Sequence, residues 1–376
     1  MSIAREVVAV GTDAAKVADE LVEKLRGPDL QLAIVFADAR LDPAVIAGVT
    51  ARALGPAPVV GCATRGVVTR LAQVGREPAA VALGLYGDWL RVGIGVVAEL
   101  SRSPLIRSRD AMHAAAAMLG TTAGELEAGR HVAFGLCDGR SAHQDSFCIG
   151  SAAGAVQLRV VGGSSSSEFT SRVPTPIWVN GEAMVDAGVI VVLESTRPIR
   201  VVTSAHLVPT DVRAVVTAAS GRAVEELDGF PAASRLGQLV AHISGGAPED
   251  SYPVEFAFAR YIDGVPYVRS IMDVDGQRLV LAGAVEAGHV LRVMRPGDLI
   301  GTTRADLAAA AQAVGGTVSA LLAFSCASRH VEAMARRQDA KLAAEYAVYP
   351  VVGLQTYGEQ IGMVLVNHTL TGLVIA

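Results

Sequence analysis

The chain has 376 residues, of which 51% are hydrophobic and only 5% aromatic, and its formal net charge at pH 7 is −5. A chain of this length is expected to form two or three domains, and apolar mass made mostly of Ala, Val and Leu suits buried strands flanked by helices. The acidic balance offers no basic surface for nucleic acid, and no basic amphipathic helix for a membrane surface is present.

The sequence predicts a cytoplasmic protein with no membrane span. Arg5 and Glu6 stand where a signal peptide would have its apolar core. The uncharged residues between Asp306 and Arg329 could reach across a bilayer, but a Gly-Gly pair and scattered polar side chains favour an Ala-rich helix, a turn and a buried strand. The cysteines form no CxxC pair and no zinc spacing, which favours a reduced protein: Cys62, Cys137, Cys148 and Cys326.

The first predicted elements are an amphipathic helix over residues 13–26 and an apolar strand over residues 32–40 that ends in Arg40. A second helix should then begin with Asp42 as its N-cap and Pro43 at its first position. The segment PVVGCATRGVVTR follows at residues 58–70, and it passes from an apolar run through a glycine into a polar turn. A strand over residues 81–87 completes this first unit.

The same succession of elements returns twice. Residues 131–140 form a strand ending in Arg140, a helix with a Ser141/Gln144 capping box follows, and LRVVGGSSSSEF and the strand 189–195 come next. Near the end of the chain, a strand over residues 320–329 ends in Arg329. A helical stretch, YPVVGLQTYGEQIG and the strand 363–369 follow it.

The spacing supports an internal repeat, because the distance from the arginine to the first glycine of the VVG step is 21, 22 and 24 residues in the three units. The alternative is that any α/β protein contains strand–helix–strand units. We predict an α/β (mixed α+β) fold of repeated strand–helix–strand–strand units, forming helix-covered sheets in two halves.

A different pattern separates the second and third units. Residues 252–298 are β-rich, and their Asp-Gly pairs at 263–264 and 275–276 predict hairpin turns. The segment AVEEL at residues 223–227 is predicted to be helical, and a domain break is expected between residues 205 and 225.

These stretches resemble the FIST family, a bacterial intracellular sensory module. The N-terminal resemblance lies in PDLQLAIVFADAR, PVVGCATRGVVT and RVVGGSSSSEF, and the C-terminal one in AVEELDGFPA, LLAFSCASRH, VVGLQTYGEQIG and NHTLTG. The resemblance implies a FIST N-terminal-like domain over residues 1–215 and a C-terminal-like domain over residues 216–376. The first turn departs from the family's usual GCSTAGE, because it has Arg65 among the small residues and Val67 at the acidic position.

The resemblance also implies a function. It indicates a small-ligand sensor in signal transduction, with amino acids or related metabolites as ligands, and some members of the family are described as haem-binding nitric oxide sensors. No output module follows the last strand, so we expect signalling to pass through a separate protein.

The arginine tips and the Gly-polar turns are the predicted ligand site. Arginine offers two parallel hydrogen bonds to a carboxylate, although each arginine could instead pair with Asp38, Asp138 or Glu359. Glu168 and Glu359 each lie six residues after a repeat glycine and could hold an ammonium group, although ordinary turn chemistry with a surface glutamate is the alternative. The residues predicted to bind the ligand are Arg40, Cys62, Thr64, Arg140, Ser164, Glu168, Cys326, Arg329, Thr356, Tyr357 and Glu359.

No catalytic or metal-binding residue is predicted. The three lysines, Lys16, Lys24 and Lys341, lie on helical patterns away from the turns, which disfavours a Ser-Lys dyad. An uncharacterised enzyme using Cys326 with His330, or the Ser164–Ser167 cluster, remains an alternative, although a cysteine at a strand end is usually a packing residue. Haem is the other alternative: no CxxCH motif is present, and non-covalent ligation could use His143, His330 or His368.

Overall fold

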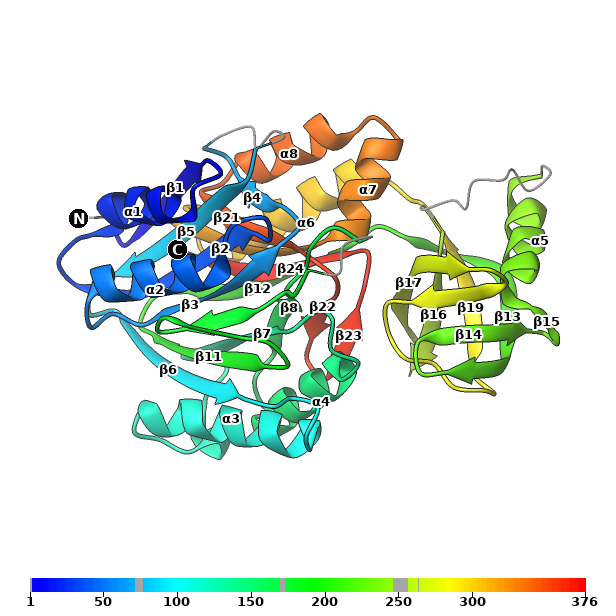
Figure 1. Cartoon of the computed structure of the whole chain (residues 1–376), viewed down its shortest axis with the longest axis horizontal. Helices are drawn as coiled ribbons and strands as arrows, with labels where there is room; N and C mark the ends of the chain where they lie inside the picture. Colours follow the sequence, from blue (N-terminus) through cyan, green and yellow to red (C-terminus); the bar gives the residue numbers. More distant parts are fainter. Residues whose placement is uncertain (1, 72–76, 170–172, 246–255, 263) are drawn as a thin grey trace.

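The computed structural model describes residues 2–71, 77–169, 173–245, 256–262 and 264–376. Figure 1 shows a large α/β body and a smaller β-rich domain beside it, the latter formed by residues between β12 (Ile199–Ala205) and α6 (Leu299–Ala313). None of the described helices is both long enough and apolar enough to cross a bilayer. The predicted Ala-rich helix, Gly-Gly turn and strand are confirmed as α6, Gly315-Gly316 and β20 (Ala320–Cys326).

The body consists of three units with one order of elements. The first unit contains β1 (Ala4–Val10), α1 (Ala14–Leu25), β2 (Leu30–Asp38), α2 (Pro43–Leu54), β3 (Val59–Thr64), β4 (Val67–Thr69) and β5 (Ala79–Tyr86). The second contains β6 (Leu90–Val97), α3 (Pro104–Met118), β7 (His131–Cys137), α4 (Gln144–Gly154), β8 (Val160–Ser164), β9 (Ile177–Val179), β10 (Glu182–Met184) and β11 (Gly188–Ser195). A short 3₁₀ turn, η1 (Ala123–Glu125), precedes β7.

The third unit is split by the smaller domain. It begins with β12 (Ile199–Ala205) and resumes with α6 (Leu299–Ala313), β20 (Ala320–Cys326), α7 (Ala327–Ala335), α8 (Asp339–Ala347), β21 (Val351–Thr356), β22 (Glu359–Ile361), β23 (Val364–Val366) and β24 (Thr369–Ile375). The predicted α/β fold of repeated units is therefore confirmed.

Each unit forms its own sheet and contributes one or two strands to the sheet of another unit. Within a unit, the first strand pairs with the last, the last pairs antiparallel with the second, and the second pairs in parallel with the third. Beyond the third strand, β9–β10 of the second unit extends the first sheet, β22–β23 of the third extends the second, and β4 of the first extends the third. The three units are therefore joined in a cycle, and none can complete its sheet alone.

The repeated VVG step has a steric cause. Gly61, Gly162 and Gly353 face the parallel neighbour strand so closely that an added Cβ would lie 1.7 to 2.3 Å from a backbone oxygen of β2, β7 or β20. No side chain fits at such a distance. These glycines are needed for strand pairing, and their recurrence marks the same register in each sheet.

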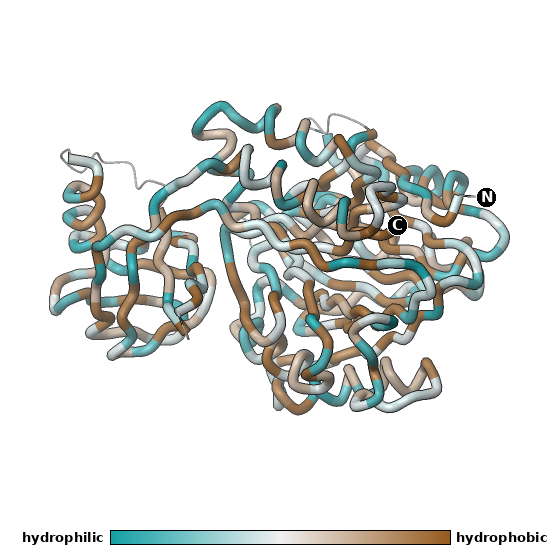
Figure 2. The backbone as a smooth tube through the Cα atoms, turned by 180° about the vertical axis from the view of Figure 1, so that it is seen from behind, coloured by the Kyte–Doolittle hydropathy of each residue, from teal (hydrophilic) through white to brown (hydrophobic). Residues whose placement is uncertain are grey.

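The three sheets share one apolar core, and helices cover their outer faces. Along β2, residues 32, 34 and 36 point into the shared core, and residues 33, 35 and 37 pack under α1 and α2. Phe324 brings the sheets together at the centre, since its ring centroid lies 6.4 Å from that of Phe36 and 6.0 Å from that of Phe134. Seen from behind in Figure 2, brown apolar stretches run along strands inside the body.

The smaller domain has its own apolar core. It contains β13 (Val208–Ser220), β14 (Ala223–Leu227), β15 (Phe230–Pro231), α5 (Ala232–Ser244), β16 (Ala257–Ile262), β17 (Val265–Asp275), β18 (Arg278–Leu281) and β19 (Val290–Arg295). The hairpin predicted at 275–276 is confirmed, with Gly276 at φ +60° and Asp275 paired with Arg278. The hairpin predicted at 263–264 falls between the paired strands β16 and β17, although residue 263 lies outside the described residues.

Two local predictions were wrong. AVEEL is the strand β14 and not a helix, because Val224 and Leu227 supply apolar side chains to a sheet whose pairing outweighs local helix propensity. Ser141 and Gln144 form no capping box: α4 begins at Gln144 with His143 as its N-cap, and the Gln144 amide donates to the carbonyls of Gly139 and Ser141. The Asp42 cap and the Pro43 start of α2 are confirmed.

Candidate functional site

The Gly-polar turns of the three units meet at one place, called here the three-turn junction. Thr64 of the first unit donates from Oγ1 to the carbonyl of Gln355 in the third, at 2.8 Å. Ser166 of the second unit donates from Oγ to the same carbonyl and from its backbone N–H to the carbonyl of Ala63. All three polar turns are therefore linked to one another by hydrogen bonds.

The serine run of the second unit fills the middle of this junction. Ser164 to Ser167 are buried, and the hydroxyls of Ser164, Ser165 and Ser166 donate to backbone carbonyls of Gly358, Thr175 and Gln355. No lysine stands beside them, since Lys16, Lys24 and Lys341 lie on α1 and α8. These hydroxyls therefore join the turns, and none of the three lysines is placed to activate one of them as a nucleophile.

Arg40 and Arg140 lie at equivalent positions at the edge of the junction. Arg40 binds Asp38 through Nε at 2.9 Å and Nη2 at 2.7 Å, so the alternative, pairing with that aspartate, is what the structure shows for Arg40. Asp38 is the main reason that the pKa of Arg40 is raised. Arg140 differs, because Nη2 donates to Ser167 Oγ at 2.8 Å and Nε to the Val173 carbonyl at 2.9 Å.

Arg65 is a site residue that the sequence reasoning missed. Its Nη1 donates to Gln355 Oε1 at 3.0 Å, and its Nε lies 3.2 Å from Glu168 Oε2. The guanidinium also lies over the ring of Phe169, 5.4 Å from its centroid, and that ring stacks on Tyr357 at 5.5 Å. The available signal was the departure of the first turn from its family pattern, where Arg65 replaces a small residue.

Glu168 and Glu359 do not occupy matching positions, which corrects the sequence alignment of the turns. In the sheets, Val67 pairs with Leu354 and Glu359 pairs with Gly163, each one residue past a repeat glycine. The corresponding residue in the second unit is Ile177, which pairs with Cys62. The second unit has extra residues before its exchanged strand, so Glu168 lies on the surface, with its side chain 60% exposed.

Glu359 is instead a buried acid inside the body. It accepts hydrogen bonds from the hydroxyls of Thr356 and Thr369 and, at 3.3 Å, from the Thr369 N–H. Burial outweighs these bonds and raises the pKa of Glu359 to about 8. The carboxyl therefore carries its proton at neutral pH and lies beneath the junction, out of contact with solvent.

Arg329 does not join Arg40 and Arg140, so the predicted three-arginine clamp is incomplete. The residue matching Arg40 and Arg140 in register is Ser328, because Ala323 pairs with Gly353 as Val35 pairs with Gly61. Arg329 lies one position further on, in α7, where it is fully buried. It donates to Thr303 Oγ1 at 2.6 Å and to the Ser204 carbonyl at 3.4 Å.

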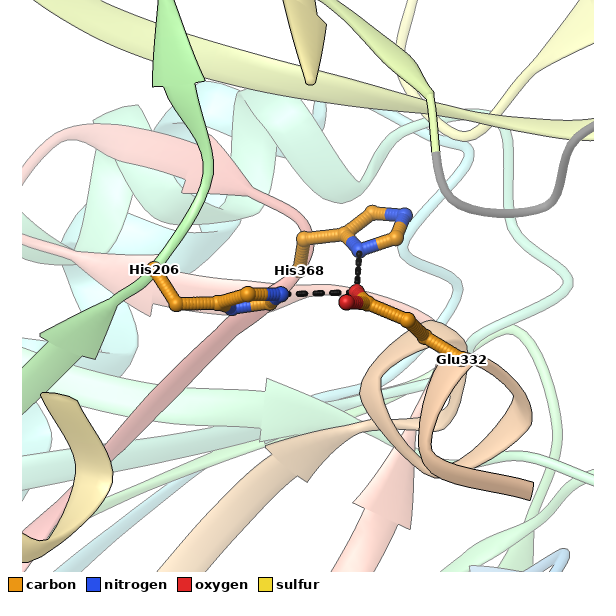
Figure 3. Close-up of side chains that lie close together, drawn as sticks. All are labelled: His206, Glu332 and His368. Atoms are coloured by element: carbon orange, nitrogen blue, oxygen red, sulfur yellow. Dashed lines mark hydrogen bonds and ion pairs between the residues drawn. The ribbon is translucent and has the colours of Figure 1, made fainter. Parts of the chain in front are cut away.

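A cluster of two histidines and a glutamate, called here the His–Glu cluster, lies beside Arg329 and consists of His206, Glu332 and His368 (Figure 3). His206 Nε2 lies 2.7 Å and His368 Nδ1 lies 3.6 Å from Glu332 Oε2. This residue set can hold a divalent metal ion. However, Arg329 Nη1 lies 3.4 Å from His206 Nδ1 and Arg336 bonds Glu332 Oε1, so two cations already stand beside the single carboxylate of the cluster.

Hydrogen bonding accounts for the His206–Glu332 pair without a metal ion, whereas His368 Nδ1 is buried and has no hydrogen-bond partner among the described residues. Since Arg329 donates to His206 Nδ1, the ring proton belongs on Nε2, where it is donated to Glu332. Burial lowers the pKa of His206 to about 4, so the ring is neutral at pH 7. Although burial opposes it, the hydrogen bond to His206 and the nearby ring of His368 lower the pKa of Glu332, which stays ionised.

The alternative catalytic and haem residues do not assemble around a common point. Burial raises the pKa of the Cys326 and Cys62 thiols, so neither is a thiolate at neutral pH. His330 is hydrogen-bonded to Ser325 at 3.0 Å and stacks on Tyr346, so it is engaged away from the Cys326 thiol. His143 is the N-cap of α4, and His368 belongs to the His–Glu cluster. Haem binding stays a prediction.

A surface groove of about 950 Å³ lies away from the junction, between α2 and the β9–β10 hairpin. Its lining includes Gln31, Arg52, Asn180 and Glu182, and it includes none of the predicted ligand residues.

Comparison with known proteins gives a family and a distant structural similarity. The FIST N domain matches residues 31–229 and the FIST C domain matches residues 232–362. No curated protein matches the chain significantly. Among solved structures, cyanuric acid hydrolase from A. caulinodans is 11% identical, with a TM-score of 0.41 over 100% of this chain and 99% of that one.

Proposed function

The chain belongs to the FIST family, whose domains are generally taken as small-ligand sensory domains in signal transduction, and we propose that it binds a small carboxylate, such as an amino acid, at the three-turn junction. The binding groups would be Arg40, Arg65 and Arg140, called here the arginine cluster. Thr64, Ser164 and Tyr357 would shape the site from the adjoining turns.

The observation that carries this proposal is the difference in burial and hydrogen bonding among the acidic side chains around the arginine cluster. Asp38 and Asp138 are 6% exposed and are held by hydrogen bonds from their own turns. Asp138 also accepts from Thr175 Oγ1 and the Asp186 N–H, each at 2.8 Å. Glu168 is the acid of this set that lies on the surface, so a ligand carboxylate could replace it without breaking the buried structure.

The chemistry of arginine supports an anionic ligand. A guanidinium presents a planar fork of N–H groups that matches a carboxylate, and it remains charged at every physiological pH. Arg65 is 17% exposed, so its charge is partly removed from water and interacts more strongly with an anion than a fully solvated lysine would. A charge-assisted bond contributes about 1.5–3 kcal/mol where the anion is shielded from water, and less where the anion is exposed as Glu168 is.

The proposal includes a path from the junction to the smaller domain. The Asn367 amide donates to the Tyr357 carbonyl at 3.0 Å, and its Oδ1 accepts from the Ser270 N–H of β17 at 3.3 Å. Arg269 of the same strand binds Asp145 near the start of α4 at 2.9 Å. A ligand-dependent movement of Tyr357 would therefore alter the seating of the smaller domain, which a separate output protein could recognise.

A titration of the purified protein with amino acids, acetate, succinate and benzoate tests the proposal. We expect at least one carboxylate to bind and to raise the melting temperature. Arg65→Gln should weaken binding about tenfold or more, because it removes a charge-assisted bond. Arg102→Gln is the matched control, since that exposed arginine lies away from the junction. If no carboxylate binds, or if Arg65→Gln binds as tightly as the wild type, the proposal is wrong.

A further inference from the structure

We infer that Glu168 and Phe169 act as a built-in substitute for the ligand, and that the ligand is a carboxylate attached to a flat apolar group, such as an aryl carboxylate. The inference rests on the proposed function and identifies its ligand class. It assigns to two adjacent residues the role of an internal competitor at the arginine cluster.

The carboxylate of Glu168 occupies the position expected for a ligand anion. Its Oε2 lies 3.2 Å from Arg65 Nε. It also acts on Arg40, where its negative charge adds to that of Asp38 in raising the pKa of the guanidinium. One surface carboxylate therefore pairs with Arg65 and acts electrostatically on Arg40, and these two arginines come from different turns of the first unit.

The ring of Phe169 occupies the position expected for the rest of the ligand. It lies under the Arg65 guanidinium at 5.4 Å, and it stacks on Tyr357 at 5.5 Å with an interplanar angle of 24°. The Phe169 ring thus contacts the Arg65 cation and the aromatic ring of Tyr357. Both contacts would suit any other flat π system in the same position. The Tyr357 hydroxyl donates to the Ser167 carbonyl at 2.6 Å, which orients the tyrosine ring against that of Phe169.

The internal pair is weakly held and can be displaced. An ion pair whose acid is 60% exposed contributes at most about 1 kcal/mol, because water solvates the carboxylate nearly as well as the arginine does. Asp38 and Asp138, by contrast, are buried and fixed by several hydrogen bonds. A free carboxylate would take the position of Glu168 and preserve the balance of charge around the arginine cluster.

The same geometry defines the selectivity. Acetate could replace the Glu168 carboxylate and leave the stacked ring in place, so it would gain only the charged contact. Benzoate carries a carboxylate and a ring and could replace both groups. We therefore expect benzoate to bind more tightly than acetate and to exclude Phe169 from Tyr357.

Calorimetric titration with benzoate and acetate tests the inference on three proteins: wild type, Glu168→Gln and Phe169→Leu. Removing the competing charge should tighten binding of both anions about threefold to fivefold. Removing the ring should tighten binding of benzoate and leave binding of acetate nearly unchanged. Glu182→Gln on β10 is the matched control, because this exposed glutamate lies outside the junction.

The outcomes separate the inference from the proposed function. If the wild type binds carboxylates through Arg65 but Glu168→Gln binds them no more tightly, Glu168 is no competitor and only the inference is overturned. If acetate binds as tightly as benzoate to every protein, the assignment of a flat ligand is overturned. If neither Glu168→Gln nor the wild type binds any carboxylate, both proposals are wrong.

Discussion

Replacing Glu359 by glutamine should change how the stability of the protein depends on pH. Glu359 is fully buried and its pKa is raised to about 8, against an ordinary value of about 4.3 in an unfolded chain. The folded state therefore binds this proton more tightly than the unfolded state does. The contribution of Glu359 to the free energy of unfolding is greatest below pH 4.3, decreases as the pH rises to 8, and is constant above pH 8.

The size of the effect follows from the difference between the pKa of Glu359 in the folded state and its pKa in the unfolded state. Each pH unit between them is worth about 1.36 kcal/mol, so the wild type should lose roughly 4 kcal/mol between pH 5 and pH 9 through this residue. That loss is a large part of the 5–15 kcal/mol by which domains are usually stable. Glutamine cannot ionise. Its carbonyl oxygen can accept from the Thr369 hydroxyl and N–H, and its amide can donate to the Thr356 hydroxyl oxygen, so Glu359→Gln should not show the loss.

Urea denaturation at pH 5, 7 and 9 provides the measurement. The free energy of unfolding of Glu359→Gln should be close to that of the wild type at pH 5 and should exceed it by about 4 kcal/mol at pH 9. The exposed variant Glu182→Gln should show no such trend. A difference between Glu359→Gln and the wild type that stays constant from pH 5 to pH 9 would refute the assignment of a buried, protonated carboxyl.

Three further predictions concern the repeat and the His–Glu cluster. Gly61→Ala should destabilise the protein by about 3 kcal/mol or more or prevent folding, because the new Cβ would overlap the Val35 carbonyl, whereas Gly124→Ala meets no atom within 4 Å and should unfold at the wild-type denaturant concentration. His206 has its pKa lowered to about 4, so the folded state resists its protonation and stability should fall as the pH drops from 6.5 to 4, by roughly 3 kcal/mol. His206→Gln should lose that part of the acid dependence in denaturation curves, and an unchanged curve would contradict the neutral-ring assignment. Zinc should not raise the melting temperature, because the Arg329 guanidinium donates to His206 Nδ1 and so keeps the ring proton on Nε2, the nitrogen that would have to bind the metal. Stabilisation by zinc that disappears in Glu332→Gln would show that the His–Glu cluster does bind a metal ion.

Some features could be predicted from the sequence because they are local. Asp42-Pro43 starts a helix wherever it stands before an apolar periodic segment, and α2 begins there. The VVG steps were recognisable because a side chain at each of these glycines would overlap the backbone of the parallel neighbour strand, so glycine recurs in all three units. AVEEL was predicted wrongly because its conformation is not set locally: a short segment with a weak local preference takes its conformation from the sheet it joins.

The composition of the junction required the fold. From spacing alone, Glu168 and Glu359 looked equivalent and Arg329 looked like a third clamp residue. Extra residues before β9 moved Glu168 to the surface, and a one-residue offset after β20 turned Arg329 into the interior. Arg65 was visible as a departure from the family pattern, but nothing local indicated that its partners come from residues about 100 and 290 positions away.

The sequence by itself determined the repeated α/β units, their helix starts and their tight glycine steps, because these depend on neighbours close in the chain or on a pattern that recurs. Only the tertiary structure decided which polar residues meet. The cyclic exchange of strands brings turns of all three units to one junction, and insertions of a few residues decide which side chains reach it and which are buried beneath it.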